Sequence, residues 1–79
     1  MKISFRKDIN NADRFVKLCS SYKEDVELHA IGKYIVNAKS SLGVASCAGY
    51  DDLEVIIKAD DHESAEKFYN AVKEAGFAK

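Results

Sequence analysis

Two stretches of this chain have apolar residues at the three- and four-residue spacing of an amphipathic helix, which must bury one face. The first covers residues 10–22, and the second begins at Asp60 or Asp61 and continues to Gly76. The apolar faces consist of Ala12, Phe15, Val16 and Cys19 in the first stretch and Ala65, Phe68, Tyr69 and Val72 in the second. Two helices of this kind need a sheet against which they can bury their apolar faces.

Three shorter stretches, residues 2–7, 26–30 and 53–59, alternate between buried-type and more polar positions, as strands with one buried face do. Residues 34–36, Tyr-Ile-Val, are of residue types that favour a strand, and with residues 31–33 as the turn they form the second arm of a hairpin with residues 26–30. A short helix of small residues should begin at Ser40 or Ser41 and end near Gly49. Asp60 and Glu63 have the spacing of a capping box for the last helix. The order βαββαβα predicts an α+β fold, a two-layer sandwich with a four-stranded antiparallel sheet and its helices on one face.

Size and composition restrict both the architecture and the class of function. The 79 residues, of which 47% are hydrophobic and 32% charged, suffice for one small packed domain over residues 1–79. A net charge of -1, with basic and acidic residues interspersed, argues against nucleic-acid binding. Because no stretch approaches the ~18 apolar residues of a membrane span and no targeting segment follows Met1, we expect a cytoplasmic protein without a membrane partner.

The cysteines and histidines do not form a recognisable site. Cys19 and Cys47 lie far apart without metal-ligand neighbours, so we interpret both as buried thiols. His29 falls in the middle of a predicted strand, and His62 lies in an acidic segment that a capped helix start explains without a metal. We expect no metal and no cofactor. Because no nucleophile elbow or phosphate loop is present, we also expect no enzymatic activity.

One segment of the chain nevertheless resembles a known family. Residues 32–44, Gly-Lys-Tyr-Ile-Val-Asn-Ala-Lys-Ser-Ser-Leu-Gly-Val, resemble the serine-centred regulatory segment of the histidine-containing phosphocarrier (HPr) family. Residues 25–28 are similar to that family's second strand, and the element order matches from end to end. The third strand has one residue more than the family pattern, Tyr34 or Ile35.

The resemblance implies the HPr fold and a role in the bacterial phosphoenolpyruvate-dependent sugar phosphotransferase system. The partners that it implies are proteins of that system, a transcriptional regulator and a serine kinase. No nucleic acid, membrane or metal is among them.

The residues at the family's histidine site differ from its pattern. Asp8 falls at the position of the phosphoryl-accepting histidine, Asn10 at that of an arginine and Asn11 at that of a proline. An aspartate could form an acyl phosphate, but no metal-binding carboxylate cluster lies nearby in the sequence. Asp8 could also imitate the charge of the phosphoryl group or cap the first helix, and we favour the cap. We therefore expect no catalytic residue and no phosphohistidine relay.

Ser40 corresponds to the regulatory phosphoserine of the family and also stands where a helix begins. Its hydroxyl could cap that helix, accept a phosphoryl group, or do both. Capping alone is favoured because Ser41 stands where the family usually has a large apolar residue and Ala45 where it often has methionine. The remaining candidates for partner binding, Leu42, Val44 and Phe15, form either a protein interface or part of the core.

The sequence therefore predicts an HPr-like protein that has lost the histidine and acts as a non-catalytic regulatory or binding module. The alternative is a ferredoxin-like small-molecule or protein-binding domain unrelated to sugar transport, which strand order would distinguish. A third hypothesis, a structural remnant or a dimerising subunit, predicts a dimer in solution.

Overall fold

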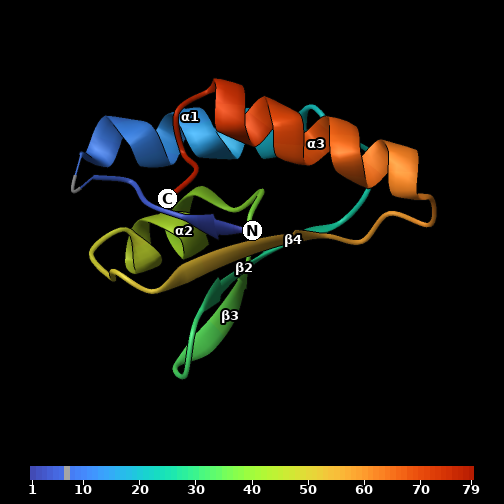
Figure 1. Cartoon of the computed structure of the whole chain (residues 1–79). Coiled ribbons are helices and arrows are strands. Elements are labelled where there is room, and N and C mark those ends of the chain that lie inside the picture. The colour runs from blue at the N-terminus through green and yellow to red at the C-terminus, as the bar shows by residue number, and fades with distance from the viewer. Residues whose placement is uncertain (7) are drawn as a thin grey trace.

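The computed structural model describes residues 1–6 and 8–79, and three helices accompany a four-stranded antiparallel sheet (Figure 1). The elements follow one another in the order β1 (Lys2–Ile3), α1 (Ile9–Ser20), β2 (Val26–Ala30), β3 (Tyr34–Asn37), α2 (Ser41–Cys47), β4 (Leu53–Ile57) and α3 (His62–Glu74). The βαββαβα order and the α+β sandwich that the sequence predicts are confirmed.

The strands pair in the order β1-β4-β2-β3, and every pair is antiparallel. The register places Leu28 of β2 opposite Val55 of β4 and Val36 of β3. Because side chains alternate along a strand, Ile35 and Ile56 fall on one face, and Leu28, Val36 and Val55 fall on the other. Those of β2 and β4 are buried, whereas their alternate neighbours are partly exposed. We call these two sides the covered face and the open face.

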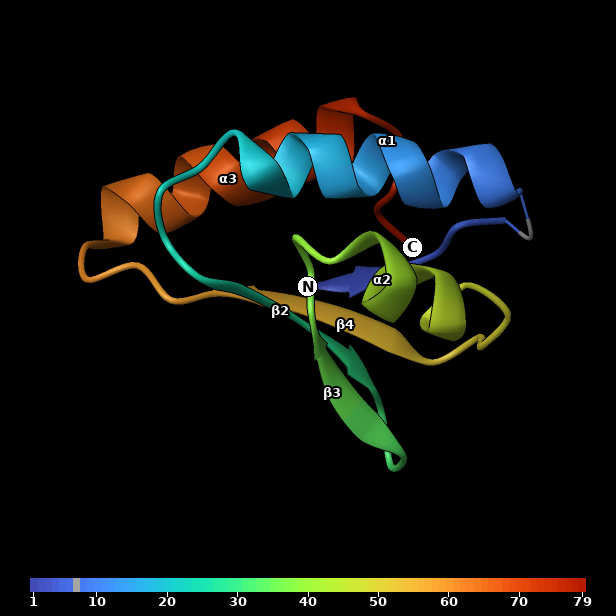
Figure 2. The same ribbon diagram turned by 180° about the vertical axis from the view of Figure 1, so that it is seen from behind.

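Helices α1 and α3 lie side by side over the sheet in both views of the molecule (Figures 1 and 2). Beneath them, Phe5, Phe15 and Phe77 meet edge to face, with ring centroids 5.2 to 6.0 Å apart. All three rings are almost completely buried. Such pairs stabilise a fold beyond the apolar area that they bury. This aromatic cluster joins α1 to both ends of the chain.

Strand β1 is shorter than the alternation over residues 2–7 predicts. Ile3 and Phe5 are both buried, as that alternation requires. The strand nevertheless ends at Ile3, and the backbone turns at Arg6, which has the left-handed φ of 52°. Lys7 lies outside the described residues. The prediction identified the buried face correctly and the length of the strand incorrectly, because only tertiary pairing decides where a ladder ends.

The hairpin between β2 and β3 is regular at Tyr34 and Ile35, where the sequence suggests one residue more than the family pattern. Ala30 pairs with Tyr34, and the register continues without interruption to Glu27 and Asn37. The turn contains Gly32, whose φ of 78° is a left-handed conformation that favours glycine. The pairing is therefore regular, and no bulge is needed.

Helix α3 begins after Asp61, the second of the two aspartates at which the sequence allows it to start, so Asp60 and Glu63 do not form the predicted capping box. Asp61 is the N-cap, and its carboxylate accepts a hydrogen bond from the Ser64 N–H at 2.9 Å. The extended backbone of Asp61 directly precedes the helix, so that the third helical residue is Ser64 instead of Glu63. Hydrogen bonding by Ser64 lowers the pKa of Asp61.

Substitutions on the two faces of the hairpin should differ in cost. Leu28→Ala, on the covered face, should lower the free energy of unfolding by about 2–5 kcal/mol because it leaves a cavity. The matched variant Ile35→Ala removes a side chain that is 58% exposed and should cost less than about 1 kcal/mol. Equilibrium unfolding in urea measures both. Equal losses would contradict the assignment of the faces.

Candidate functional site

Ser40 is the N-cap of α2. Its backbone is extended, and its Oγ accepts a hydrogen bond from the Gly43 N–H at 3.2 Å. Its carbonyl accepts a second bond from the Val44 N–H at 2.9 Å. The hydroxyl therefore satisfies an amide of the first turn that has no partner within the helix. The capping role predicted for Ser40 is confirmed, and its role as a phosphoacceptor stays a prediction.

The residues before Ser40 hold the start of α2 against the end of α1. Asn37 closes the turn, because its side-chain oxygen accepts from the Lys39 N–H at 2.9 Å and its carbonyl accepts from the Ser40 N–H at 3.0 Å. The Lys39 ammonium donates to the carbonyl of Tyr22 at 2.6 Å. Tyr22 lies just beyond the last residue of α1, so this bond anchors the Ser40 segment there.

Gly43 lets α2 approach β3 closely. A Cβ atom at this position would lie 3.2 Å from the Cβ of Val36 and 3.4 Å from the Oγ of Ser40. The first distance is shorter than carbon atoms in van der Waals contact prefer. The absence of a side chain at Gly43 therefore leaves room for the Ser40 hydroxyl and for the contact between α2 and β3.

Asp8 is the N-cap of α1. Its carboxylate accepts a hydrogen bond from the Asn10 N–H at 2.9 Å, and its carbonyl accepts one from the Asn11 N–H at 3.0 Å. The side-chain amide of Asn11 donates to the carbonyl of Phe5 at 2.9 Å. The capping role that the sequence favours for Asp8 is confirmed. Asn10 and Asn11 contribute no positive charge to this helix start.

The structure does not bring Asp8 and Ser40 together. Asp8 precedes α1, whereas the Ser40 segment is tied to Tyr22 beyond the other end of that helix. A helix of 12 residues is about 18 Å long. The two caps therefore lie at opposite ends of α1 and belong to separate sites.

The two histidines of the chain lie elsewhere. The Nε2 of His29, on the open face of β2, is 2.9 Å from a carboxylate oxygen of Glu27. Hydrogen bonding by His29 is the main reason why the pKa of Glu27 is lowered, and Lys58, 3.5 Å away, contributes further. His62 is the first residue of α3, which begins at the end of the molecule opposite the start of α1 (Figures 1 and 2). Neither histidine lies at the start of α1.

The three residues predicted for partner binding do not share a surface. Leu42 is 87% exposed, whereas Phe15 and Val44 are completely buried. A buried side chain offers nothing to a partner, so Phe15 and Val44 belong to the core, the alternative that the sequence left open. Cys19 and Cys47 are buried free thiols, as predicted. Burial raises the pKa of Cys19 to about 12.

Beside α2, Tyr34, Tyr50 and Lys33 form a group of contacts that the sequence did not predict. The Tyr34 hydroxyl donates to the carbonyl of Ser46 at 3.0 Å, and the ring of Tyr34 meets that of Tyr50 edge to face. The Lys33 ammonium lies 5.0 Å from the centre of the Tyr50 ring, within the range of a cation–π interaction. The available signal was Tyr34 itself, a large residue in the stretch that exceeds the family pattern.

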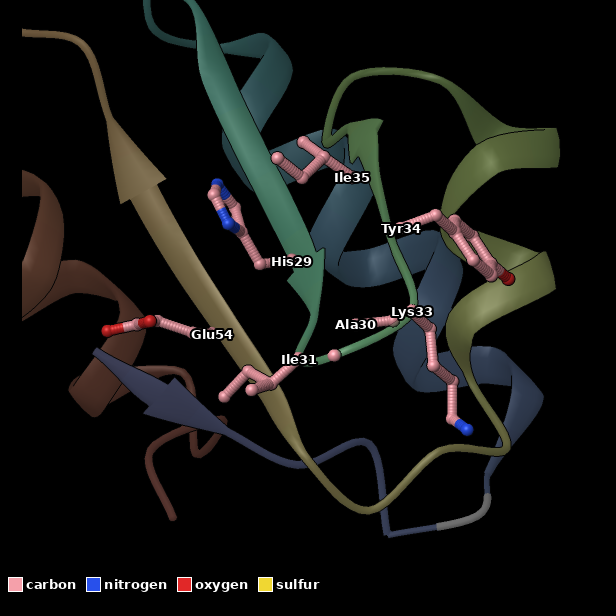
Figure 3. Close-up of a pocket in the computed structure, with 8 residues that line it drawn as sticks. His29, Ala30, Ile31, Lys33, Tyr34, Ile35 and Glu54 are labelled. Atoms are coloured by element: carbon pink, nitrogen blue, oxygen red, sulfur yellow. The ribbon is translucent and has the colours of Figure 1, made fainter.

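Two hollows flank the hairpin, with volumes of about 450 and 340 Å³. The residues around the larger one do not converge on a common point. His29 and Ile35 lie on one side of the hairpin, whereas Tyr34 points toward α2 (Figure 3). This arrangement does not form an enclosed ligand pocket.

Within residues 1–6 and 8–79, no group of three or more histidine, cysteine, aspartate or glutamate side chains could hold a metal ion. None of the helices described is both long and apolar enough to cross a bilayer.

Removing the cap of α2 should destabilise the fold modestly. Ser40→Ala should lower the free energy of unfolding by about 1 kcal/mol, because the Gly43 N–H loses its partner. Ser40→Asp should stay within a few tenths of a kcal/mol of the wild type, because aspartate is an equally good cap. Urea unfolding measures both, with Ser41→Ala as the control. An equal loss for Ser41→Ala would contradict the assignment of the cap.

The pair of His29 and Glu27 should make stability depend on pH. The pKa of Glu27 is lowered in the folded protein, so ionised Glu27 favours folding above its ordinary pKa of 4.5. This contribution is lost as the pH falls through the lower, folded value. Wild type should therefore exceed Glu27→Gln in stability at pH 7, and the difference should shrink below pH 4.5. In a His29→Asn background, the difference should be smaller at every pH, which urea unfolding at several pH values checks.

Comparison with known protein families identifies a match over most of the chain. The chain matches a family model described as "PTS HPr component phosphorylation site" over residues 8–75. A search of curated proteins found no match. HPr proteins are phosphocarriers that interact with other proteins of the phosphotransferase system, and the match favours this family over a ferredoxin-like domain. With the match covering most of its length, this chain belongs to the HPr family.

Proposed function

We propose that this HPr-family protein does not carry phosphoryl groups on histidine. In this proposal, it acts as a regulatory or binding module of the sugar phosphotransferase system, as a single domain over residues 1–79 in the bacterial cytoplasm. The observation that supports the proposal most strongly is Asp8, a capping carboxylate at the start of α1 where the family pattern has its histidine. The two histidines of the chain, His29 on β2 and His62 on α3, lie away from this helix start.

The chemistry of Asp8 supports the loss of the relay. An imidazole nitrogen is a neutral nucleophile, whereas the carboxylate is negatively charged and repels a phosphoryl donor. Its charge also already interacts with the positive end of α1, where the added phosphate would be stabilised. Asn10 stands at the arginine position and is uncharged, so it cannot form the bidentate contact that arginine makes with phosphate.

Ser40 is the residue that we propose as the phosphoacceptor. Its hydroxyl oxygen already lies at the start of α2, 3.2 Å from the Gly43 amide nitrogen. A phosphate there would carry roughly two negative charges and face the positive end of the helix dipole. A serine kinase would transfer the phosphoryl group from ATP to the Oγ of Ser40 and release ADP.

The surface beside Ser40 supports recognition by another protein. Leu42, two residues further along the chain, is 87% exposed. A large apolar side chain with this exposure loses contact with water when a partner covers it, and the loss favours binding. Phosphorylation would place charge close to this contact and thereby change its affinity. The partners that we propose are phosphotransferase-system proteins, a transcriptional regulator and the serine kinase.

The histidine relay can be tested directly. With labelled phosphoenolpyruvate and enzyme I, the protein should acquire no label, because Asp8 stands at the phosphorylation position. An HPr protein with its histidine serves as the positive control in the same reaction. Stable label located on Asp8 by mass spectrometry would overturn the proposal.

The proposed phosphorylation of Ser40 needs a separate test. With ATP and a kinase that phosphorylates the regulatory serine of HPr proteins, the protein should gain one phosphate. Ser40→Ala should abolish the gain, whereas Ser41→Ala, the adjacent control, should retain it. Intact-mass measurement followed by peptide mapping reports the site. Phosphate gained by the Ser40→Ala variant, or none gained by the wild type, would refute the assignment of Ser40.

A further inference from the structure

The two residues that precede Ser40 are held by two separate parts of the fold. The Ala38 N–H donates to the carbonyl of Val26 on β2 at 2.9 Å, and the Ala38 side chain is completely buried. The Lys39 ammonium donates to the carbonyl of Tyr22 at 2.6 Å. A hydrogen bond from a charged donor is stronger than one between neutral groups. The segment is therefore tied to the sheet through Ala38 and to the end of α1 through Lys39.

Asn37, the last residue of β3, connects this segment to Ser40. Its side-chain oxygen accepts from the Lys39 N–H at 2.9 Å, and its carbonyl accepts from the Ser40 N–H at 3.0 Å. Asparagine is favoured in turns because its side chain bonds the backbone two residues further on and so imitates a backbone turn. One residue thus fixes the backbone of both Lys39 and Ser40.

The backbone of this turn also sets the direction of the Ser40 hydroxyl. Its Oγ accepts a hydrogen bond from the Gly43 N–H at 3.2 Å. A hydroxyl has two acceptor lone pairs and one O–H donor, so this bond leaves one lone pair and the proton for other partners. Phosphoryl transfer uses both groups, because a lone pair attacks phosphorus and a base accepts the proton. The cap therefore orients the hydroxyl without consuming the groups that would react.

Phosphoryl transfer depends strongly on the position of the attacking oxygen. That oxygen must lie roughly in line with the bond between the transferred phosphorus and the leaving oxygen of ADP. A displacement of about 1 Å can slow an enzymatic reaction ~100-fold. A segment that is already ordered also spares the kinase the entropy cost of fixing it. The hydrogen bonds before Ser40 thus bear on the rate of its modification.

We propose that Asn37 is a positioning residue for the phosphorylation of Ser40. This inference rests on the proposed function, because it concerns the same reaction. By holding the Lys39 N–H, Asn37 keeps Ser40 in the extended conformation from which its Oγ reaches Gly43. In the reaction, a bond forms between this Oγ and the γ-phosphorus of ATP, the bond from that phosphorus to ADP breaks, and the hydroxyl proton passes to a base of the kinase. Asn37 acts through the backbone and takes no part in this chemistry.

Steady-state phosphorylation of the intact chain, by ATP and a kinase that phosphorylates the regulatory serine of HPr proteins, tests the proposal. Asn37→Ala should lower kcat about three- to tenfold, the effect of losing one hydrogen bond that orders a reacting group, and should change KM less. Asn37→Asp and Asn37→Ser should restore most of the rate, because each keeps an oxygen that can accept from the Lys39 N–H. The control Asp61→Ala removes the cap of α3 and should leave the rate unchanged. Amide NMR spectra verify that every variant is folded.

Hydrogen exchange measures the orientation of the Ser40 hydroxyl without a kinase. In Asn37→Ala, the Lys39 amide loses its partner and should exchange faster. The Gly43 amide should also exchange about three- to tenfold faster, because the Ser40 hydroxyl is held on it less of the time. Asn37→Asp and Asn37→Ser should return both rates toward those of the wild type. The Ser64 amide at the start of α3 is the internal reference and should not change.

The possible outcomes separate this inference from the proposed function. A wild type that gains no phosphate refutes the phosphorylation of Ser40 and, with it, any role of Asn37 in that reaction. If the wild type is phosphorylated but Asn37→Ala reacts equally fast, the positioning role alone is wrong. An unchanged exchange rate of the Gly43 amide, or an equal loss of rate in Asp61→Ala, leads to the same conclusion. Failure of both Asn37→Asp and Asn37→Ser to restore the rate also overturns the positioning role, because it indicates direct contact between the kinase and the Asn37 amide.

Discussion

The burial of one face of the sheet is the constraint on which the rest of this structure depends. Leu28 and Val55 lie opposite each other on the two central strands, and both are completely buried. They belong to the same buried core as the cluster of Phe5, Phe15 and Phe77. Helices α1 and α3 lie side by side over the sheet (Figure 1). The removal of this apolar layer from water is the main favourable term in folding a chain of this size. The helix starts that carry the candidate sites are held in place by it.

Helix caps connect this architecture to function. Asp8 and Ser40 both satisfy a free amide at a helix start, yet they differ in chemistry. Aspartate brings a permanent negative charge, whereas serine is neutral until it is modified. Replacing a histidine by aspartate at the first cap therefore preserves the helix and supports the proposed loss of the relay. A serine at the second cap serves the helix and leaves a hydroxyl that a kinase could use.

The open side of the hairpin follows from the same two-layer architecture. Helices cover one face of the sheet, and the C-terminal tail covers its β1 edge, so the groups of the sheet that stay uncovered lie at β3 and on the open face. Ile35 is exposed there although its neighbour Val36 packs close to α2. A single residue step along a strand reverses the direction of the side chain. The exposed face of the hairpin and the Ser40 segment are therefore different surfaces, although α2 packs against β3.

The sequence by itself determined the element order and the buried faces of β1, β2 and β4, and it favoured Asp8 and Ser40 as caps, because these features depend on local periodicity and on the hydrogen bonding of short polar side chains. Tertiary structure decided the end of β1 and the choice of Asp61 over Asp60, since each depends on where the backbone turns. It also placed Phe15 and Val44 in the core and left Leu42 on the surface. All three residues are apolar, and periodicity indicates which face of a helix is apolar without indicating what covers it. Burial depends on how the elements pack together, and packing exists only in three dimensions.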